Sequence, residues 1–311
     1  MNQLPEQDLP PGRHRLLKEH LMTEIRRDEA PARRRNAWLR PAIAAAAVAT
    51  AAAVTFVLLP SGGGGEGASA QPPSRATVAM LEDIALAAEH EDSPGTIRDD
   101  QYVYVDAKVS YSQSGNGVKT KIPPLHRLET WHAVDGTRAG LYREAGRGQW
   151  SGEPDAKPGK PGYDVATNYR HLQTLPTDPG KMYDWLHETA PKQSGQETDQ
   201  AMFVLVGDLI RDAVVPPGQS AALYRAVARI PGVTVIDDVV DAAGRHGVAI
   251  ARKDPDNPSR DEWIFDRKTH EFLGERTVAT SDWSGGVKKG DVTSNTAVLD
   301  RAVVDKRGQR P

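Results

Sequence analysis

The 311-residue sequence contains no cysteine. This absence excludes disulfides, thiolate metal sites, a cysteine nucleophile and the lipid-modified cysteine of a lipoprotein. An excess of charge of one sign is also lacking, because 39 basic and 42 acidic residues leave a net charge of −3. The chain therefore has no global basic field for nucleic acid. A domain of this composition has to be held together by its core alone.

The familiar catalytic and metal-binding motifs are missing as well. The sequence has no G-x-S-x-G, no H-E-x-x-H and no glycine-rich phosphate loop. His126 and His132 have the same parity on one expected strand, but no further ligand nearby completes a metal site. We therefore expect no catalytic residue, no cofactor and no metal ion. A Ser/His/Asp triad is assembled in space and leaves no such signature, so this class of site stays open.

Long apolar runs are rare in the sequence, with one exception between Ala42 and Leu59. This run carries no charge, and its only polar members are Thr50 and Thr55. At helical rise it spans roughly 27 Å, close to the hydrocarbon thickness of a bilayer. We expect a transmembrane anchor over residues 41–60. The alternative is a buried helix of an ordinary domain.

Basic residues lie on one side of this run only. Arg33, Arg34, Arg35 and Arg40 precede it, and the next basic residue after it is Arg75. The positive-inside rule then leaves the N-terminus in the cytoplasm and carries the C-terminal portion across the membrane. A cleaved signal with its processing site after Ala70 is the competing interpretation. The long distance from the apolar run favours an uncleaved anchor.

The composition divides the chain into five segments. In the cytoplasmic stub, Leu17, Leu21 and Ile25 repeat at four-residue steps on an expected helix. This stripe could dock a partner or rest on the inner leaflet. The five segments are the stub (residues 1–40), the anchor (41–60), a Gly/Ser/Pro linker (61–75), an extracytoplasmic domain (76–300) and a polar tail (301–311).

The first part of the extracytoplasmic domain reads as a helix followed by strands. Thr77 is the expected N-cap of a helix that ends near Glu89. Residues 101–112 alternate between apolar and polar side chains and predict a strand with one buried face. Residues 125–135 and 137–144 predict a hairpin with a tight turn at Asp135-Gly136, both in positive φ. The Gly/Pro/Lys-rich stretch 146–162 is expected to be a mobile loop.

Helices and then further strands follow. Asp178 and Pro179 have the positions of N-cap and first helical residue. Two more helices are expected over residues 198–214 and 220–229, and four short alternating strands over residues 233–283 predict an antiparallel meander. Residues 299–311 are expected to form an edge strand and then a disordered tail. The fold class is therefore α+β, a curved antiparallel sheet with a helical insertion.

Four motifs resemble those of a known family. They are "LPTDP" from Leu175, "ARIPGVTVIDDVVDAAGRHGVAIAR" from Ala228, "WIFDRKTHEFLGER" from Trp263 and "ETWHAVDGTRAGLYRE" from Glu129. With the basic stub and single anchor, they resemble actinobacterial single-span membrane proteins that are often encoded beside extracytoplasmic-function sigma factors. The sheet pattern is also similar, in fold only, to the half-barrels of lipoprotein carriers and of anti-sigma-factor regulators. The resemblance supplies no catalytic residues.

These observations favour a non-enzymatic, membrane-anchored extracytoplasmic domain that binds a ligand or an envelope protein. We expect the anchor to lie in the lipid bilayer and the partner to be an envelope or sigma-regulatory protein. We expect contacts from Leu17, Leu21 and Ile25 in the stub, and from Tyr102, Tyr104 and Trp131 on the concave face of the sheet. The alternatives are an envelope hydrolase of unrecognised type and a purely structural envelope protein.

Overall fold

The computed structural model describes residues 71–91, 95–115, 118–156, 165–190, 196–283 and 285–311. The expected stub, its Leu17, Leu21 and Ile25, and the anchor lie outside these residues. Among the residues that are described, none belongs to a helix with the length and apolar character that a bilayer crossing requires. The expectations for residues 1–60, and for processing after Ala70, remain predictions.

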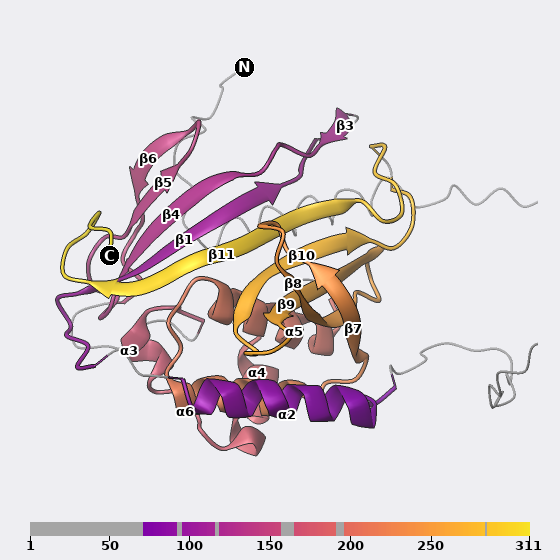
Figure 1. Cartoon of the computed structure of the whole chain (residues 1–311), viewed down its shortest axis with the longest axis horizontal. Helices are drawn as coiled ribbons and strands as arrows, with labels where there is room; N and C mark the ends of the chain where they lie inside the picture. The colour runs from indigo at the N-terminus through magenta and orange to yellow at the C-terminus, as the bar shows by residue number, and fades with distance from the viewer. Residues whose placement is uncertain (1–70, 92–94, 116–117, 157–164, 191–195, 284) are drawn as a thin grey trace, which may run out of the picture.

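Nine strands of the described chain form one antiparallel sheet. Its curvature is visible in Figure 1, where the strands arch over the helices. From one edge to the other the strands are β6 (Gly148–Ser151), β5 (Leu141–Glu144), β4 (His126–Ala133), β1 (Tyr102–Tyr111), β11 (Val292–Val304), β10 (Phe272–Ala279), β9 (Ser259–Asp266), β8 (His246–Lys253) and β7 (Val233–Val240). A separate two-stranded ribbon pairs β2 (Gln113–Gly115) with β3 (Val118–Lys121).

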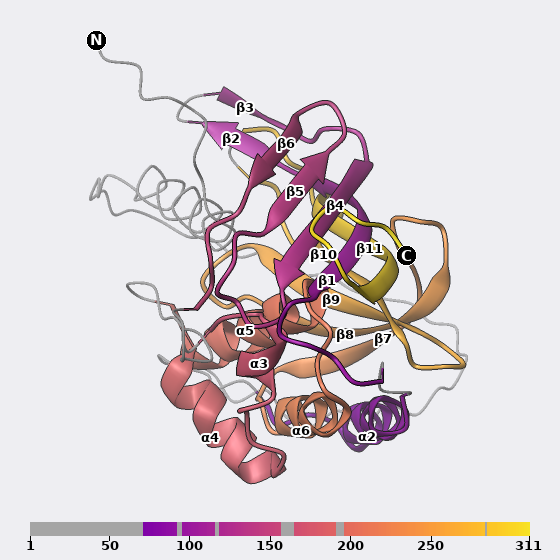
Figure 2. The same ribbon diagram turned by 90° about the vertical axis from the view of Figure 1, so that its left-hand side faces the viewer.

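The helices gather on one face of this sheet, which we call the inner face; the opposite one is the outer face (Figures 1 and 2). The helical insertion is confirmed, since four of the helices lie between β6 and β7 in the chain. The helices are α2 (Arg75–Glu89), α3 (Tyr169–Leu172), α4 (Pro179–Thr189), α5 (Thr198–Arg211) and α6 (Pro217–Val227).

The main core fills the space between the inner face and the helices. Phe203 of α5 stacks on Trp263 of β9 with ring centroids 3.9 Å apart and an interplanar angle of 6°. Val103 and Val105 of β1 belong to this core. Tyr102 and Tyr104 alternate with these valines along β1. They therefore lie on the outer face, where they form a second cluster with Trp131.

The end of the chain differs most from expectation. Residues 299–304 are part of β11, which lies between β1 and β10 in the middle of the sheet rather than at an edge. Tyr102 of β1 pairs with Val304 of β11, so the first strand of the sheet in chain order pairs with the last. The sequence pattern missed this position because pairing between such distant segments has no local signature.

Three local expectations also need correction. Ser74, not Thr77, is the N-cap of α2, because its side chain accepts a hydrogen bond from the Thr77 amide. The β4–β5 hairpin forms, but its turn closes with the Gly136 amide donating to the Ala133 carbonyl, and Asp135 does not adopt positive φ. The expected loop 146–162 contains the edge strand β6. The expected cap at Asp178 is confirmed, with Pro179 following it.

Candidate functional site

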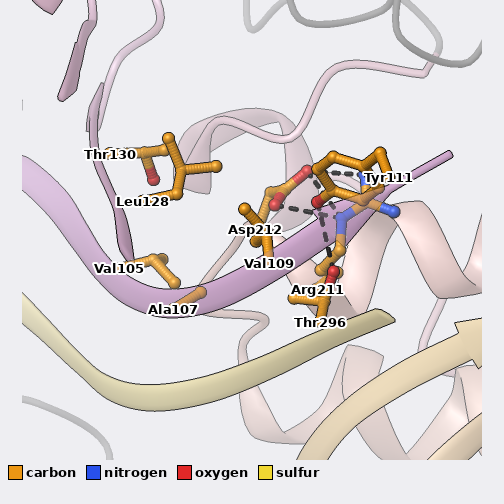
Figure 3. Close-up of a pocket in the computed structure, with 9 residues that line it drawn as sticks. All are labelled: Val105, Ala107, Val109, Tyr111, Leu128, Thr130, Arg211, Asp212 and Thr296. Carbon is orange, nitrogen blue, oxygen red and sulfur yellow. Dashed lines mark hydrogen bonds and ion pairs between the residues drawn. The ribbon is translucent and has the colours of Figure 1, made fainter. Parts of the chain in front are cut away.

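A pocket opens on the inner face beside the end of α5 (Figure 3). The space free of atoms at this position is about 250 Å³, counted together with open solvent at the mouth, and its enclosed part has room for about one water molecule. The lining residues come from four elements that are distant in sequence. They are Val105, Ala107, Val109 and Tyr111 of β1, Leu128 and Thr130 of β4, Arg211 and Asp212 at the end of α5, and Thr296 of β11.

The register of the sheet explains why these side chains share one surface. Thr130 lies opposite Val105, and Leu128 lies opposite Ala107, in the β1–β4 pair. Alternation then directs all four side chains to the same face. Val105, Ala107 and Val109 are buried. The pocket therefore has an aliphatic floor.

Three buried polar atoms beside this floor have no hydrogen-bond partner in the described structure. They are Thr130 Oγ1, His132 Nε2 and the Tyr142 hydroxyl. Thr130 pairs directly with Tyr142 across β4 and β5, and the His132 ring meets the Tyr142 ring edge-on at 5.6 Å. Most buried polar groups in proteins are hydrogen-bonded. Among the three, Thr130 belongs to the pocket lining, where its hydroxyl is available for a hydrogen bond.

The rim of the pocket carries permanent charge. The Arg211 guanidinium contacts Asp212 at 2.8 Å, Glu275 at 2.7 Å and Asp208 at 3.1 Å. Burial lowers the pKa of Arg211, but these carboxylates raise it by more, so it stays protonated. Burial raises the pKa of Asp212, and the charge and hydrogen bonds of Arg211 outweigh this, leaving it below its ordinary value. Neither group titrates near neutral pH, so neither suits general acid–base chemistry.

Tyr111 completes the rim on the side of β1. Its hydroxyl lies 3.1 Å from Thr296 Oγ1. Burial raises the pKa of this phenol to about 12, so it too stays protonated at neutral pH. The pocket thus presents an aliphatic floor, hydroxyl groups and one fixed ion pair, a combination that suits recognition.

His126 and His132 do not form a metal site. His126 and His132 share the inner face, as their parity predicted, but His126 pairs with Glu144 at 2.7 Å. Asp155 lies near His132 and His171; burial raises its pKa and the two rings lower it. Across the described ranges, no three His, Asp or Glu side chains are placed to hold a metal ion.

The three aromatic residues expected as contacts lie together, but not where expected. Tyr102, Tyr104 and Trp131 are on the outer face, away from the pocket. The reason is parity, because their neighbours Val103 and Val105 take the inner positions of β1. Trp131 is fully buried, and its indole N–H donates to the Gln309 carbonyl of the C-terminal segment. A partner could reach this cluster only if that segment moved.

Glu129, beside this aromatic cluster, is expected to make the fold sensitive to acid. Hydrogen bonds from Arg310 outweigh burial and lower the pKa of Glu129 to about 2. That value lies below the unfolded-state pKa, so the stabilisation is complete above about pH 5 and is lost as the pH falls toward 2. We expect up to about 3 kcal/mol of unfolding free energy to disappear over this interval in urea titrations. The Glu129→Gln variant should lack that component, and parallel pH profiles for the two proteins would contradict the assignment.

Sequence reasoning did not single out the pocket residues. Arg211 and Asp212 follow directly after Ile210, an apolar position of the expected helix. The sequence signal available for this part of the pocket was therefore a pair of adjacent opposite charges at the end of a helix. The distances that join them to Tyr111 and Thr130 depend on the sheet order, which no local pattern in the sequence specifies.

Comparisons with known proteins find likeness to solved structures alone. No protein-family model and no curated protein matches the chain, so the resemblance to an actinobacterial family receives no support from them. The chain is similar to MucB at 13% identity and a TM-score of 0.30, covering 77% of this chain and 62% of MucB. It is similar to the complex of Pseudomonas aeruginosa MucA and MucB at 15% identity and a TM-score of 0.26, covering 76% and 58%.

A LolA superfamily protein from Nitrosomonas europaea matches at 8% identity and a TM-score of 0.18, covering 71% of this chain and 92% of that one. The chain spans about three fifths of the MucB chains that it matches. With TM-scores of 0.30 and below, no residue role is transferred from them.

Proposed function

We propose that this chain is a non-enzymatic protein-binding domain, anchored in the membrane by residues 41–60, and that it serves sigma-factor-linked envelope signalling from outside the cytoplasm. The observation that carries the binding role is the inner-face pocket, where the buried Thr130 hydroxyl has no hydrogen-bond partner among the described residues. MucB is solved in complex with MucA, and for this chain we propose a contact of the same general kind, with a protein. The anchor and the signalling context come from the sequence motifs.

The size of the pocket favours a side chain over a lipid as its occupant. Its enclosed part holds about one water molecule, which is far too little for an acyl chain. The open part is bordered by the Arg211–Asp212 ion pair, which is better matched by a polar group than by hydrocarbon. One side chain of a partner, with an apolar body and a polar tip, would cover Leu128 and reach Thr130 Oγ1.

Site-specific photo-crosslinking tests the proposal. A benzophenone amino acid at Leu128, in the full chain expressed in its own cells, should give one discrete protein adduct that mass spectrometry identifies. The matched control carries the same probe at Leu86, an exposed apolar residue of α2. The adduct should fall at least about tenfold when Asp212→Asn is combined with the Leu128 probe, since an ion at a specific contact contributes more than about 1.4 kcal/mol. Equal adducts from both positions, or adducts with lipid alone, would refute protein binding at the pocket.

A further inference from the structure

The C-terminal segment, residues 305–311, lies on the outer face of the sheet and ends beside β4, on the side away from the helices (Figures 1 and 2). Arg310 donates to both carboxylate oxygens of Glu129 at 2.6 and 2.7 Å. The Gln309 carbonyl accepts from the Trp131 indole, and Arg307 donates to the Ser151 hydroxyl of β6. The segment therefore contacts β4 and the edge strand through named polar groups.

The surface beneath this segment is built to receive an arginine. Glu129 is 3% exposed, and its carboxylate also accepts from the Tyr104 hydroxyl at 2.9 Å. The Tyr104 and Trp131 rings lie 5.1 Å apart, and the Arg143 guanidinium covers the Trp131 ring at 4.9 Å. A fixed carboxylate that binds both arms of a guanidinium selects arginine over lysine by geometry. The indole N–H beside it fixes the neighbouring backbone carbonyl. We call Glu129, Trp131 and Tyr104 the outer-face site.

The segment that fills this site is attached by hydrogen bonds that each involve a side chain, and not by strand pairing. The Arg310 side chain is 51% exposed even while it is paired, and residues 305–311 contain no helix or strand. A segment held by side-chain hydrogen bonds, without strand pairing, opens more easily than a packed strand. Its tether to β11 nevertheless supplies an effective concentration of the order of millimolar, so it excludes weaker competitors.

We propose that the outer-face site is a docking surface for an arginine-bearing extended segment of a protein partner, and that residues 305–311 hold it closed in the unbound chain. The internal segment shows the chemistry that the site accepts, which is a backbone carbonyl on the Trp131 indole and, on the next residue, a guanidinium on Glu129. This surface is on the opposite side of the sheet from the inner-face pocket and does not depend on the function proposed for it.

The test uses the heptapeptide DKRGQRP with an amidated C-terminus, which copies residues 305–311. Its binding is measured by calorimetry, and by the Trp131 indole resonance identified with a Trp131→Phe variant. Peptide binding is compared between two proteins, the intact chain and a chain that ends at residue 304. Both retain the N-terminal portion. We expect the shortened chain to bind this peptide at least tenfold more tightly than a peptide with glutamine at the Arg310 position. The intact chain should bind it at least tenfold more weakly than the shortened chain does.

A second variant retains residues 305–311 in the chain. In the intact chain, Arg310→Gln should free residues 305–311, seen as at least tenfold faster amide exchange, and should allow the peptide to bind; adding Glu129→Gln should abolish that binding. Equal affinity for both peptides overturns the proposal. The proposal is also overturned if the shortened chain unfolds and the Arg310→Gln variant does not bind the peptide, because residues 305–311 then serve only to stabilise the fold. Self-association of the intact chain through exchanged segments would identify a second copy as the occupant and would likewise overturn it.

Discussion

Replacing Trp263 by alanine is expected to lower the free energy of unfolding by about 3–5 kcal/mol, as for other large aromatic residues removed from a core. The indole is 1% exposed and stacks on Phe203, with ring centroids 3.9 Å apart. It also touches the backbone of α5 so closely that a Cβ added to Gly207 would lie 2.7 Å from its Nε1 atom. Trp263 thus joins the helical insertion to β9. Guanidinium titration of the solubilised chain measures the loss.

The matched control is Trp185→Ala on α4. This residue is only partly buried and packs against the margin of the same core. Its removal should cost less than half as much, since less apolar surface is lost and water can fill the space. If the two substitutions had equal effects, the stacking of Trp263 on Phe203 would not be the dominant contact between helix and sheet.

Gly274→Ala is expected to destabilise by about 4 kcal/mol or more, or to prevent folding, which places it among the largest single-residue effects. Gly274 is in β10 with φ at +153°, and an added Cβ would lie 2.0 Å from the Thr296 carbonyl oxygen. Thr296 belongs to β11, at the centre of the sheet. The methyl group would force the two strands apart at a point where both are fixed by neighbours. Circular dichroism and thermal unfolding provide the measurement.

Gly146→Ala separates backbone strain from the steric clash. Gly146 also has positive φ, at +84°, but a Cβ added there would meet no atom within 4 Å beyond its own chain neighbours. This substitution should cost only the roughly 1–2 kcal/mol of a left-handed alanine. A similar loss at both positions would mean that the β10–β11 contact yields easily.

The sequence predicted the elements of the fold better than their arrangement. The α+β class, the helical insertion and the meander of β7 to β10 follow from periodicity and turn residues such as Asp178-Pro179, and these were correct. Local chemistry decided these features. The cap of α2 was misplaced by three residues because Ser74 and Thr77 are both good capping residues, and their hydroxyls contact each other at 3.0 Å.

The sequence pattern did not predict the central position of β11, because the sequence of β11 resembles that of an exposed strand. Asp300 and Arg301 interrupt the apolar alternation, which is typical of an edge. In the structure Arg301 points to the inner side and donates to the Ile210 carbonyl at the end of α5. A charged residue is therefore accommodated at the centre of the sheet by the unpaired carbonyls of a helix terminus. Only the tertiary structure reveals this partner.

The sequence pattern did not predict the candidate site for a related reason. Trp131, Tyr102 and Tyr104 attracted attention as large aromatics on strands, and the structure does bring them together. Whether such a cluster faces a partner or a segment of its own chain depends on which face the parity selects and on where residues 305–311 lie. The inner-face pocket needs the β1–β4 register and the end of α5 at once. No single stretch of sequence contains that information.

The pairing of β1 with β11 also constrains how the protein can be made. Tyr102 lies opposite Val304, about two hundred positions later in the chain. Until the ribosome has synthesised residues 292–304, the strands on each side of this gap have no hydrogen-bonding neighbour there. A chain emerging from the N-terminus, or crossing a membrane in that order, must keep two half-sheets apart from other polypeptides until β11 arrives. We therefore expect the nascent protein to depend on chaperones until residues 292–304 have emerged and β11 can form.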